Sequence, residues 1–346
     1  MRTDALDIER PGALVAYLRA AGRIGPEEPA VRVLAGGVSN RTVLVERPGG
    51  EAWVVKQALA KLRVKVDWFS DPERIHREAA GLRWLAELAP AGTITPLVFE
   101  DREHHILAMA AVPEPHANWK TMLLAGEVEA GHVAQFGRLL GTIHRGSAAR
   151  LDELRPELGD RGFFESLRLE PYYLFTAERV PAARGFLDRL VAETRATATT
   201  ITHGDYSPKN VLVGDGRLIL LDHEVIHLGD PAFDLGFGLT HLLSKAHHLP
   251  PHRAAFGSSA SHFWASYWDT VGDDAAWTDG LERRAVRHTL GCLLARARGR
   301  SPLEYLSEPE RDRQAAVVVA MMGGNPPATV AELGGRFVAA IEEAGG

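Results

Sequence analysis

The chain has a single cysteine among its 346 residues, so a disulfide within the chain is excluded. Cys292 lies in the apolar stretch 290–294, where we expect a buried, inert thiol rather than a nucleophile. No apolar run approaches the length that a membrane span requires. Residues 1–10 hold three acidic side chains and no apolar run, so neither a secretory signal nor a transit peptide is expected. These absences predict a cytoplasmic protein.

The sequence also lacks a basic block. Its net charge of -6 is spread along the chain, which gives no electrostatic reason to expect nucleic acid or an anionic membrane as a partner. With 45% hydrophobic and 24% charged residues, the composition is that of a globular protein. A small molecule is therefore the expected partner, and the sequence leaves open whether the chain forms a homodimer.

The first third of the chain alternates between strand and helix patterns. Apolar spacing predicts a short helix at 12–21, and a cap, a proline and an early acid at 71–73 predict the start of a longer one. Runs rich in valine and leucine, separated by glycine-bearing turns, predict an antiparallel meander followed by two further strands. The expected strands are 31–34, 42–46, 52–56, 95–98 and 106–111.

The rest of the chain is mainly helical by its apolar periodicity. Two prolines at 113 and 115 interrupt regular structure, so we place a boundary between a lobe of residues 1–111 and a lobe of residues 112–346. Surface loops are expected at 159–162 and 250–261. The predicted helices are 127–144, 181–195, 232–247, 282–298, 308–322 and 330–344.

One predicted hairpin gathers polar side chains. The strands 211–213 and 218–221 flank a Gly-Asp-Gly turn, so Asn210 before the first strand should meet Asp222 after the second. An amide oxygen and a carboxylate are hard ligands of the kind that Mg²⁺ prefers. Asp205 lies on the loop that enters the hairpin, within reach of an attacking hydroxyl. This combination suits phosphoryl transfer.

The segments His203-Gly-Asp-Tyr-Ser-Pro-Lys-Asn210 and Leu221-Asp-His-Glu224 resemble the catalytic loop and metal motif of the aminoglycoside phosphotransferase and choline kinase superfamily. The resemblance implies an α+β, bilobal, protein kinase-like fold with a small antiparallel-sheet lobe and a larger, mainly helical lobe. It also implies ATP and Mg²⁺ as cofactors. Asp205 would then be the catalytic base, Asn210 and Asp222 would bind the metal, and Glu224 would add a second metal contact.

Each of these motifs is weak when taken alone. A His-Gly-Asp triplet usually marks a turn, Asp222 could simply end a strand, and Asp230 before a proline is a good helix N-cap. The joint order and spacing of the motifs carry the prediction. The following segment, Asp230-Pro-Ala-Phe-Asp-Leu-Gly236, also matches the family, and there Asp234 would brace the catalytic loop.

The first lobe supplies candidate nucleotide ligands. Lys56 ends a predicted strand and Glu78 lies mid-helix, which fits the lysine and glutamate that pair over the nucleotide phosphates in kinase folds. The loop 35–41 resembles the family's nucleotide loop, where backbone groups with Ser39 and Asn40 would contact phosphate. A solvated lysine and glutamate, and an ordinary glycine-bearing hairpin, are the alternatives.

The junction of the two lobes is the expected adenine site. In this fold the base bonds to backbone groups of the linker, here residues 109–112, with Met109 nearest the base and Ala111 beside it. A core methionine is the alternative reading. Protein kinases place a lysine two residues after the catalytic aspartate, whereas this chain has Ser207 there and Lys209 four residues after. We expect one or both to contact the transferred phosphate.

The acceptor is the least defined part of the prediction. The first lobe looks most like 5-methylthioribose kinases through Val54-Val-Lys-Gln-Ala-Leu59, with Arg63 and Val64 nearby. Those kinases typically lack the asparagine at Asn210, have proline-glutamate-phenylalanine where this chain has residues 223–225, and use two arginines where Arg287 is alone. Methylthioribose therefore stays one candidate.

The other acceptors are weighed on charge and aromatic content. The terminal helices lack the dense acidity that aminoglycosides require, and Trp264, Tyr267 and Trp268 at helical spacing are more typical of a core than of a choline cage. The histidines at 241, 247, 248 and 252 do not have the spacing of a zinc site. We therefore predict a kinase that phosphorylates a hydroxyl of a sugar, amino sugar, aminoglycoside or amino alcohol. The alternative is an inactive nucleotide-binding pseudokinase.

Overall fold

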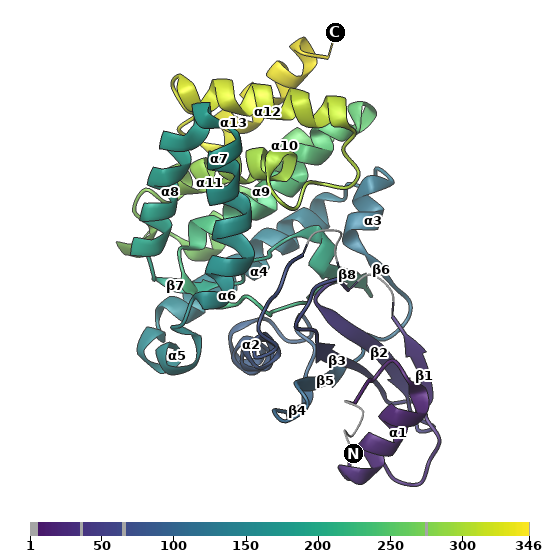
Figure 1. Cartoon of the computed structure of the whole chain (residues 1–346). Helices are drawn as coiled ribbons and strands as arrows, with labels where there is room; N and C mark the ends of the chain where they lie inside the picture. The colour runs from purple at the N-terminus through teal and green to yellow at the C-terminus, as the bar shows by residue number, and fades with distance from the viewer. Residues whose placement is uncertain (1–5, 35–36, 64–66, 274–275, 346) are drawn as a thin grey trace.

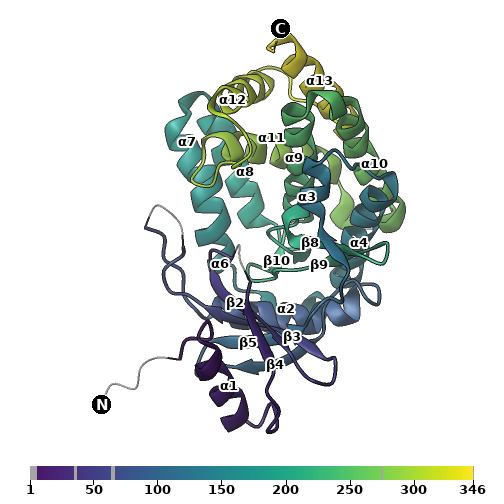
Figure 2. The same ribbon diagram turned by 90° about the vertical axis from the view of Figure 1, so that its right-hand side faces the viewer.

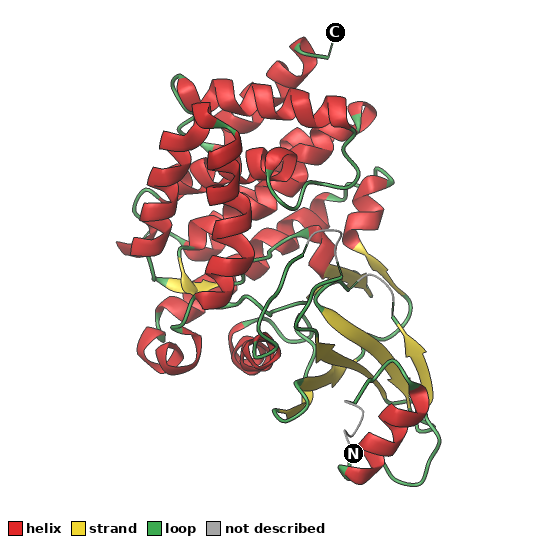
Figure 3. Ribbon diagram, in the orientation of Figure 1, coloured by secondary structure: helices red, strands yellow, loops and turns green. Residues whose placement is uncertain are grey.

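The protein has a sheet-containing part and a larger helical part (Figures 1 and 3). The computed structural model describes residues 6–34, 37–63, 67–273 and 276–345. An antiparallel sheet occupies the first third of the chain and helices dominate the remainder, so the predicted α+β, kinase-like architecture is confirmed. No helix among the described residues is both long enough and apolar enough to cross a membrane.

The sheet has five strands in the order β1-β2-β3-β5-β4, and all neighbours are antiparallel. Side chains of successive strand residues point to opposite faces, so the sheet can pack against a helix on each face. The sequence predicted all five strands to within a few residues. Their bounds are β1 Ala30–Val33, β2 Asn40–Glu46, β3 Ala52–Ala58, β4 Leu97–Asp101 and β5 Ile106–Ala110.

A helix covers each face of the sheet. Helix α1 (Pro11–Ala20) packs its buried leucines against a face that contains Val43 and Val55. Helix α2 (Arg74–Leu88) packs Ile75 and Leu82 against the other face. Because α2 lies between the sheet and the helical part, its position decides how the two parts meet (Figure 1).

The helical part is built around α9 and α4, which pack against α11 and α10 in one large apolar core. Three short strands form a second sheet in the order β6-β8-β9, and β7 pairs with β10. The helices are α3 Trp119–Leu124, α4 Ala130–Ala148, α5 Leu151–Leu158, α6 Gly162–Phe164, α7 Phe175–Arg179, α8 Arg184–Ala196, α9 Pro231–His248, α10 Arg253–Val271, α11 Leu281–Arg298, α12 Glu308–Gly323 and α13 Val330–Glu343. The short strands are β6 His116–Asn118, β7 Thr200–Thr202, β8 Val211–Gly214, β9 Arg217–Leu220 and β10 His227–Gly229.

The β8–β9 hairpin faces the five-stranded sheet (Figure 2). The backbone N–H of Leu220 donates to Thr93 O at 2.8 Å, and Ile94 forms a parallel bridge with Leu220. These contacts attach the hairpin to the segment that links α2 to β4. The hairpin is thereby fixed next to the sheet that carries Lys56.

Several features differ from the sequence prediction, which did not include helices α3 and α5 or the strands β6, β7 and β10. The expected loop at 250–261 is wrong, because Pro250–His252 form a 3₁₀ turn that leads directly into α10. Prolines are tolerated in a first helical turn. The residues Gly257-Ser-Ser259 have low helix propensity, so the sequence did not indicate a helix there. Packing of α10 against α4, α9 and α13 stabilises it nevertheless. The segment Glu165–Leu174 forms a π-helix that no periodicity indicated. The proposed division at residues 111 and 112 stays a prediction.

Close packing of α9 on α11 is expected to depend on Gly236. A Cβ at this position would lie 2.4 Å from His288 Cβ and 2.7 Å from Thr289 N. We therefore expect Gly236→Ala to lower the free energy of unfolding by about 1–3 kcal/mol, as overpacking does. Gly335→Ala is the matched control, because Gly335 lies in α13 with nothing within 4 Å, and alanine there should stabilise by up to about 1 kcal/mol. Equal effects of both changes in chemical denaturation would contradict this account.

Candidate active site

The hairpin predicted to gather the metal ligands forms as expected. Strands β8 and β9 pair Val211 with Leu220, and Leu221 N donates to Asn210 O at 2.9 Å. Asp215 and Gly216 have φ of 52° and 68°, the left-handed backbone that a tight two-residue turn requires. Asn210 thus lies across from the residue that precedes Asp222. The side-chain N–H of Asn210 donates to Asp205 O at 3.0 Å, which joins the loop before the hairpin to its base.

Asp205 is held by an arginine that the sequence analysis missed. Arg168 Nη2 lies 3.0 Å from Asp205 Oδ2, and Arg168 Nε donates to Gly204 O at 2.7 Å. Both side chains are about nine-tenths buried. Burial alone would raise the pKa of Asp205, but the charges of Arg168 and Lys209 outweigh it and hold that pKa below its usual range. Asp205 is therefore an ionised carboxylate whose orientation is fixed from one side.

Asp234 braces the loop that carries Asp205. Its two carboxylate oxygens accept from His203 N at 2.6 Å and from Gly204 N at 2.9 Å. Asp234 lies in the first turn of α9 and is fully buried. Gly204 has φ of 77°, and a Cβ there would lie 2.8 Å from Val225 Cγ2, so glycine is required at this bend. The loop is thus tied to a core helix immediately before Asp205.

Lys56 connects the sheet to the hairpin. Lys56 Nζ lies 2.6 Å from Glu78 Oε1 on α2 and 3.4 Å from Asp222 Oδ1. Burial opposes the charge on Lys56, but Glu78 and Asp222 outweigh burial and raise the pKa of the lysine. Burial would likewise raise the pKa of Asp222, and Lys56 and Lys209 outweigh it and lower that pKa. The lysine is a fixed cation beside an ionised carboxylate.

Asp222 also has an unusual backbone conformation. Its φ is 67°, in the left-handed region that residues with a side chain rarely adopt. Such a conformation costs about 1–3 kcal/mol and occurs most often where function requires a particular side-chain direction. Here it lets the chain leave β9 and turn the Asp222 carboxylate toward Lys56.

Arg74, a second arginine missed by the sequence analysis, ties Glu224 to the sheet. Its Nε lies 3.2 Å from Glu224 Oε2, and its Nη2 donates to Ser39 O and to Leu59 O. Asn40 Nδ2 also donates to Glu224 Oε2, at 3.4 Å. The predicted nucleotide-loop residues Ser39 and Asn40 are therefore next to the predicted metal residue Glu224. Ala35 and Gly36 of that loop, and Val64, lie outside the described residues.

The remaining predicted residues have varied surroundings. Ser207 is buried and its backbone O accepts from Asn210 N at 2.9 Å, while Lys209 is exposed and attracted to Asp205. Met109 is in β5, buried against α2, with its sulfur accepting from Thr95 Oγ1 at 3.3 Å. Ala111 follows β5, and its N–H donates to Ala52 O at 2.9 Å. The roles predicted for these residues stay predictions.

The donor set fits a divalent cation. Because the Asn210 amide uses its nitrogen toward Asp205 O, its oxygen is left for another partner. The Asp222 carboxylate is ionised and about one-quarter exposed. A carboxylate and an amide oxygen at the base of one hairpin are suitable Mg²⁺ ligands, with substrate phosphates and water completing the shell.

Behind Asp205 lies a basic layer formed by Arg168, Arg296 and Lys245. The guanidinium carbons of Arg168 and Arg296 lie 5.8 and 5.6 Å from the ring centre of Tyr172, and Arg296 Nη1 donates to the Tyr172 hydroxyl at 3.2 Å. Lys245 is fully buried, donates to His241 O at 3.1 Å and lies 5.4 Å from the Tyr305 ring centre. No carboxylate within salt-bridge distance of Arg296 or Lys245 is found among the described residues. Arg296 is therefore a cation with no acidic partner in that part of the chain, whereas burial lowers the pKa of Lys245 to about 7.

The other residues considered in the sequence analysis have their own structural surroundings. Arg287 pairs with Glu193 at 2.7 Å on the surface of α11. The Trp264 ring stacks on the rings of Tyr267 and Trp268, and the Tyr267 hydroxyl bonds to His144. Cys292 is buried, and burial raises its pKa to about 12, as an inert thiol requires. The histidines at 241, 247, 248 and 252 do not form a group of three close ligands within the described part of the chain.

Comparisons with known proteins show the family of the chain and support the fold. Residues 30–266 match the phosphotransferase enzyme family. Methylthioribose kinase of Pectobacterium atrosepticum is 26% identical over 281 residues, which cover 70% of this chain and 68% of that protein. Among solved structures, a choline/ethanolamine kinase family protein from Mesorhizobium loti has a TM-score of 0.52 at 15% identity, covering 97% of this chain and 99% of that one. An amicoumacin kinase in complex with AMP-PNP and Ca²⁺ has a TM-score of 0.56 at 15% identity, covering 91% and 94%.

Lys245 should make stability depend on pH. Burial, helped by the nearby Lys120 charge, lowers its pKa from 10.5 to about 7 in the folded protein. Between these values the unfolded chain binds more protons than the folded one, so stability should rise with pH across that window. This increase in the free energy of unfolding should be on the order of a few kcal/mol. We expect Lys245→Met to abolish it, as measured by chemical denaturation at a series of pH values.

Lys61→Met is the control, because Lys61 is an exposed lysine paired with Asp67. Both the native protein and this control should become more stable as the pH rises above 7, whereas Lys245→Met should not. An equal pH dependence in all three proteins would contradict a neutral buried lysine.

Proposed function

Since the chain belongs to the phosphotransferase enzyme family, we propose that it transfers the γ-phosphate of ATP to a hydroxyl group of a small molecule. The observation that carries the proposal is the convergence of Asp205, Asn210 and Asp222 on one hairpin next to Lys56. Asp205 and Asn210 lie on the loop that enters the hairpin and Asp222 follows it, and tertiary contacts hold Asp205 and Asp222. This is the arrangement that a phosphoryl-transfer site requires, where positioning and neutralisation of charge supply most of the catalysis.

In the proposed mechanism Asp205 accepts or orients the proton of the acceptor hydroxyl. Its carboxylate is ionised because Arg168 and Lys209 stabilise the charge. The Arg168 contact to Oδ2 and to Gly204 O fixes the plane of the carboxylate. Asp234 holds the backbone on the other side of the loop. Asp205 is thus preoriented before a substrate arrives, which lowers the entropic part of the barrier.

Phosphate positioning is assigned to the sheet and to the hairpin. Lys56, held by Glu78, would bind phosphate oxygens, and Lys209 would contact the transferred group from the exposed side of the loop. Asn210 and Asp222 would hold Mg²⁺, with Glu224 as a further ligand. When bound, the cation neutralises charge on the triphosphate. Ser39 and Asn40 would cover the phosphates, and the linker near Met109 and Ala111 would take the adenine.

For the acceptor we propose a neutral sugar. The likeness to a methylthioribose kinase supports a sugar hydroxyl. Polycationic aminoglycosides are disfavoured because Arg296 has no carboxylate partner among the described residues and would repel a cationic group near it. Choline is disfavoured for the same reason, and the aromatic residues considered for a choline cage stack on each other.

Replacing Asp205 is the first test. We expect Asp205→Asn to lower kcat by about 10²–10⁴-fold, because the general base is lost. The dissociation constant for MgATP should change by less than about threefold, since ATP contacts are assigned to other residues. Steady-state phosphate transfer and calorimetric nucleotide titration measure the two quantities.

Asp215→Asn is the matched control, because Asp215 is exposed at the hairpin turn and asparagine tolerates its left-handed φ of 52°. It should keep native activity. Loss of activity in both variants, or in neither, would overturn the role of Asp205. No transfer from MgATP to any hydroxyl by the native chain would favour the pseudokinase alternative.

An acceptor panel tests the proposed substrate class. We expect methylthioribose or another neutral sugar to give a kcat/KM at least about 100-fold above that of any aminoglycoside. This ratio corresponds to a few kcal/mol of repulsion between the aminoglycoside and the cationic side chains of the protein. Transfer is followed by ADP release and by the mass of the phosphorylated product. Preferred phosphorylation of an aminoglycoside or of choline would refute the sugar assignment and leave the kinase assignment intact.

A further inference from the structure

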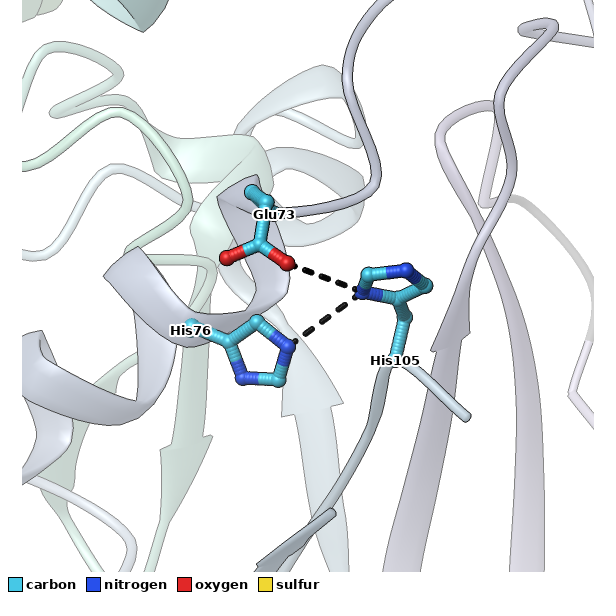
Figure 4. Close-up of side chains that lie close together, drawn as sticks. All are labelled: Glu73, His76 and His105. Atoms are coloured by element: carbon cyan, nitrogen blue, oxygen red, sulfur yellow. Dashed lines mark hydrogen bonds and ion pairs between the residues drawn. The ribbon is translucent and has the colours of Figure 1, made fainter. Parts of the chain in front are cut away.

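A second cluster of ligand-type side chains lies on the far side of α2 from the hairpin. Glu73 and His76 come from the start of α2, and His105 comes from the turn between β4 and β5. The three side chains point toward one another (Figure 4). His76 Nε2 lies 3.3 Å from His105 Nδ1, and His105 Nδ1 lies 3.5 Å from Glu73 Oε1. Among the described residues, this is the one group of three such ligands whose atoms all lie within 4.8 Å.

The surroundings of His76 orient it as a metal ligand. Its Nδ1 lies 2.6 Å from Glu100 Oε1, so we assign the proton to Nδ1 and the lone pair to Nε2. Arg83 and Arg102 lie 2.9 and 3.3 Å from Glu100 and hold that carboxylate in place. Histidine ligands in metalloproteins typically donate their second ring N–H to a carboxylate in this way. His76 is 5% exposed, so its direction is fixed by packing.

The distances match a tetrahedral centre. Zinc binds histidine nitrogen at about 2.0–2.1 Å and carboxylate oxygen at a similar distance, which places neighbouring ligand atoms about 3.3 Å apart. The two shorter separations in the cluster are 3.3 and 3.5 Å. Glu73 is about half exposed, so a small rotation of its side chain can close the remaining gap.

The backbone at His105 supports a functional role. Its φ is 48°, a left-handed conformation that is uncommon for a residue other than glycine and that orients the ring toward α2. The His105 carbonyl accepts from Ala58 N at 3.1 Å, at the end of the strand that carries Lys56. The cluster therefore joins α2 to two strands of the sheet.

We propose that Glu73, His76 and His105 bind a transition-metal cation of the Zn²⁺ class, with a water molecule as the fourth ligand. Imidazole nitrogen with one carboxylate suits such a cation better than Mg²⁺ or Ca²⁺. The site is separate from the phosphoryl-transfer residues. A bound cation crosslinks the first turn of α2 to the sheet two residues before Glu78, and so fixes the helix that presents Glu78 to Lys56.

The alternative is that the two rings share a proton without a metal. The test compares the metal-free full chain with His105→Gly, which removes one ligand and suits the left-handed φ. His104→Ala is the matched control, because its ring bonds to Asp101 and lies outside the cluster. Zn²⁺ is titrated against a chromophoric chelator, and melting temperature is followed with and without Zn²⁺. Native protein and His104→Ala should bind one tight equivalent and melt higher with Zn²⁺, and His105→Gly should bind at least tenfold more weakly.

A second variant, Glu73→Gln, keeps a hydrogen-bonding side chain at an exposed position and should also weaken Zn²⁺ binding at least tenfold. Cobalt(II) in place of zinc should give the intense visible absorption of a tetrahedral site in the native protein and in His104→Ala, but not in His105→Gly or Glu73→Gln. Equal Zn²⁺ affinity in the native protein and His105→Gly would assign the metal to other histidines. Absence of tight Zn²⁺ binding in the native protein would favour the alternative, in which the two histidine rings share a proton without a metal. Either result overturns the proposal, and neither depends on kinase activity.

Discussion

The buried contact of Lys56 with Glu78 and Asp222 is the interaction on which the rest of the structure depends. It joins three elements, because the lysine comes from β3, the glutamate from α2 and the aspartate from the end of the β8–β9 hairpin. Glu78 is fully buried, so its charge is stable only with the lysine in place. Any movement of α2 away from the sheet would separate this pair and leave a buried carboxylate without a partner. The relative position of the two parts of the molecule is therefore coupled to the candidate active site.

Helix α2 is tied to its surroundings at successive turns. Arg74 at its start binds Glu224 and two backbone carbonyls, and Glu78 one turn later binds Lys56. His76 lies between them on another side of the helix, against Glu100 and His105. Closely spaced polar contacts on different faces restrict rotation of a helix as well as its translation. A metal ion bound by His76 and His105 would replace the hydrogen bond between their two rings with coordinate bonds.

The sequence predicted the parts of the site that local patterns encode. Hairpin geometry alone predicted that Asn210 and Asp222 lie near each other. A strand pattern, a helix pattern and the order of the motifs predicted that Lys56 pairs with Glu78. Arg168 could not be found in this way, because it lies in a π-helix whose periodicity matches neither of the common elements. Its one signal was an arginine between two buried leucines. Such a charge must have a buried partner, although the sequence does not say which.

The balance of charge in the site explains why a triphosphate would enter together with a cation. Four carboxylates, those of Glu78, Asp205, Asp222 and Glu224, are matched by the four cations Lys56, Arg74, Arg168 and Lys209. Most of these cations already bind a carboxylate, so the positive charge that Lys56 and Lys209 would offer to phosphate oxygens is partly compensated. A triphosphate alone would add negative charge next to Asp222 at a high electrostatic cost. The same carboxylate that repels the bare nucleotide attracts a divalent ion, so nucleotide and metal should bind with positive cooperativity at this hairpin.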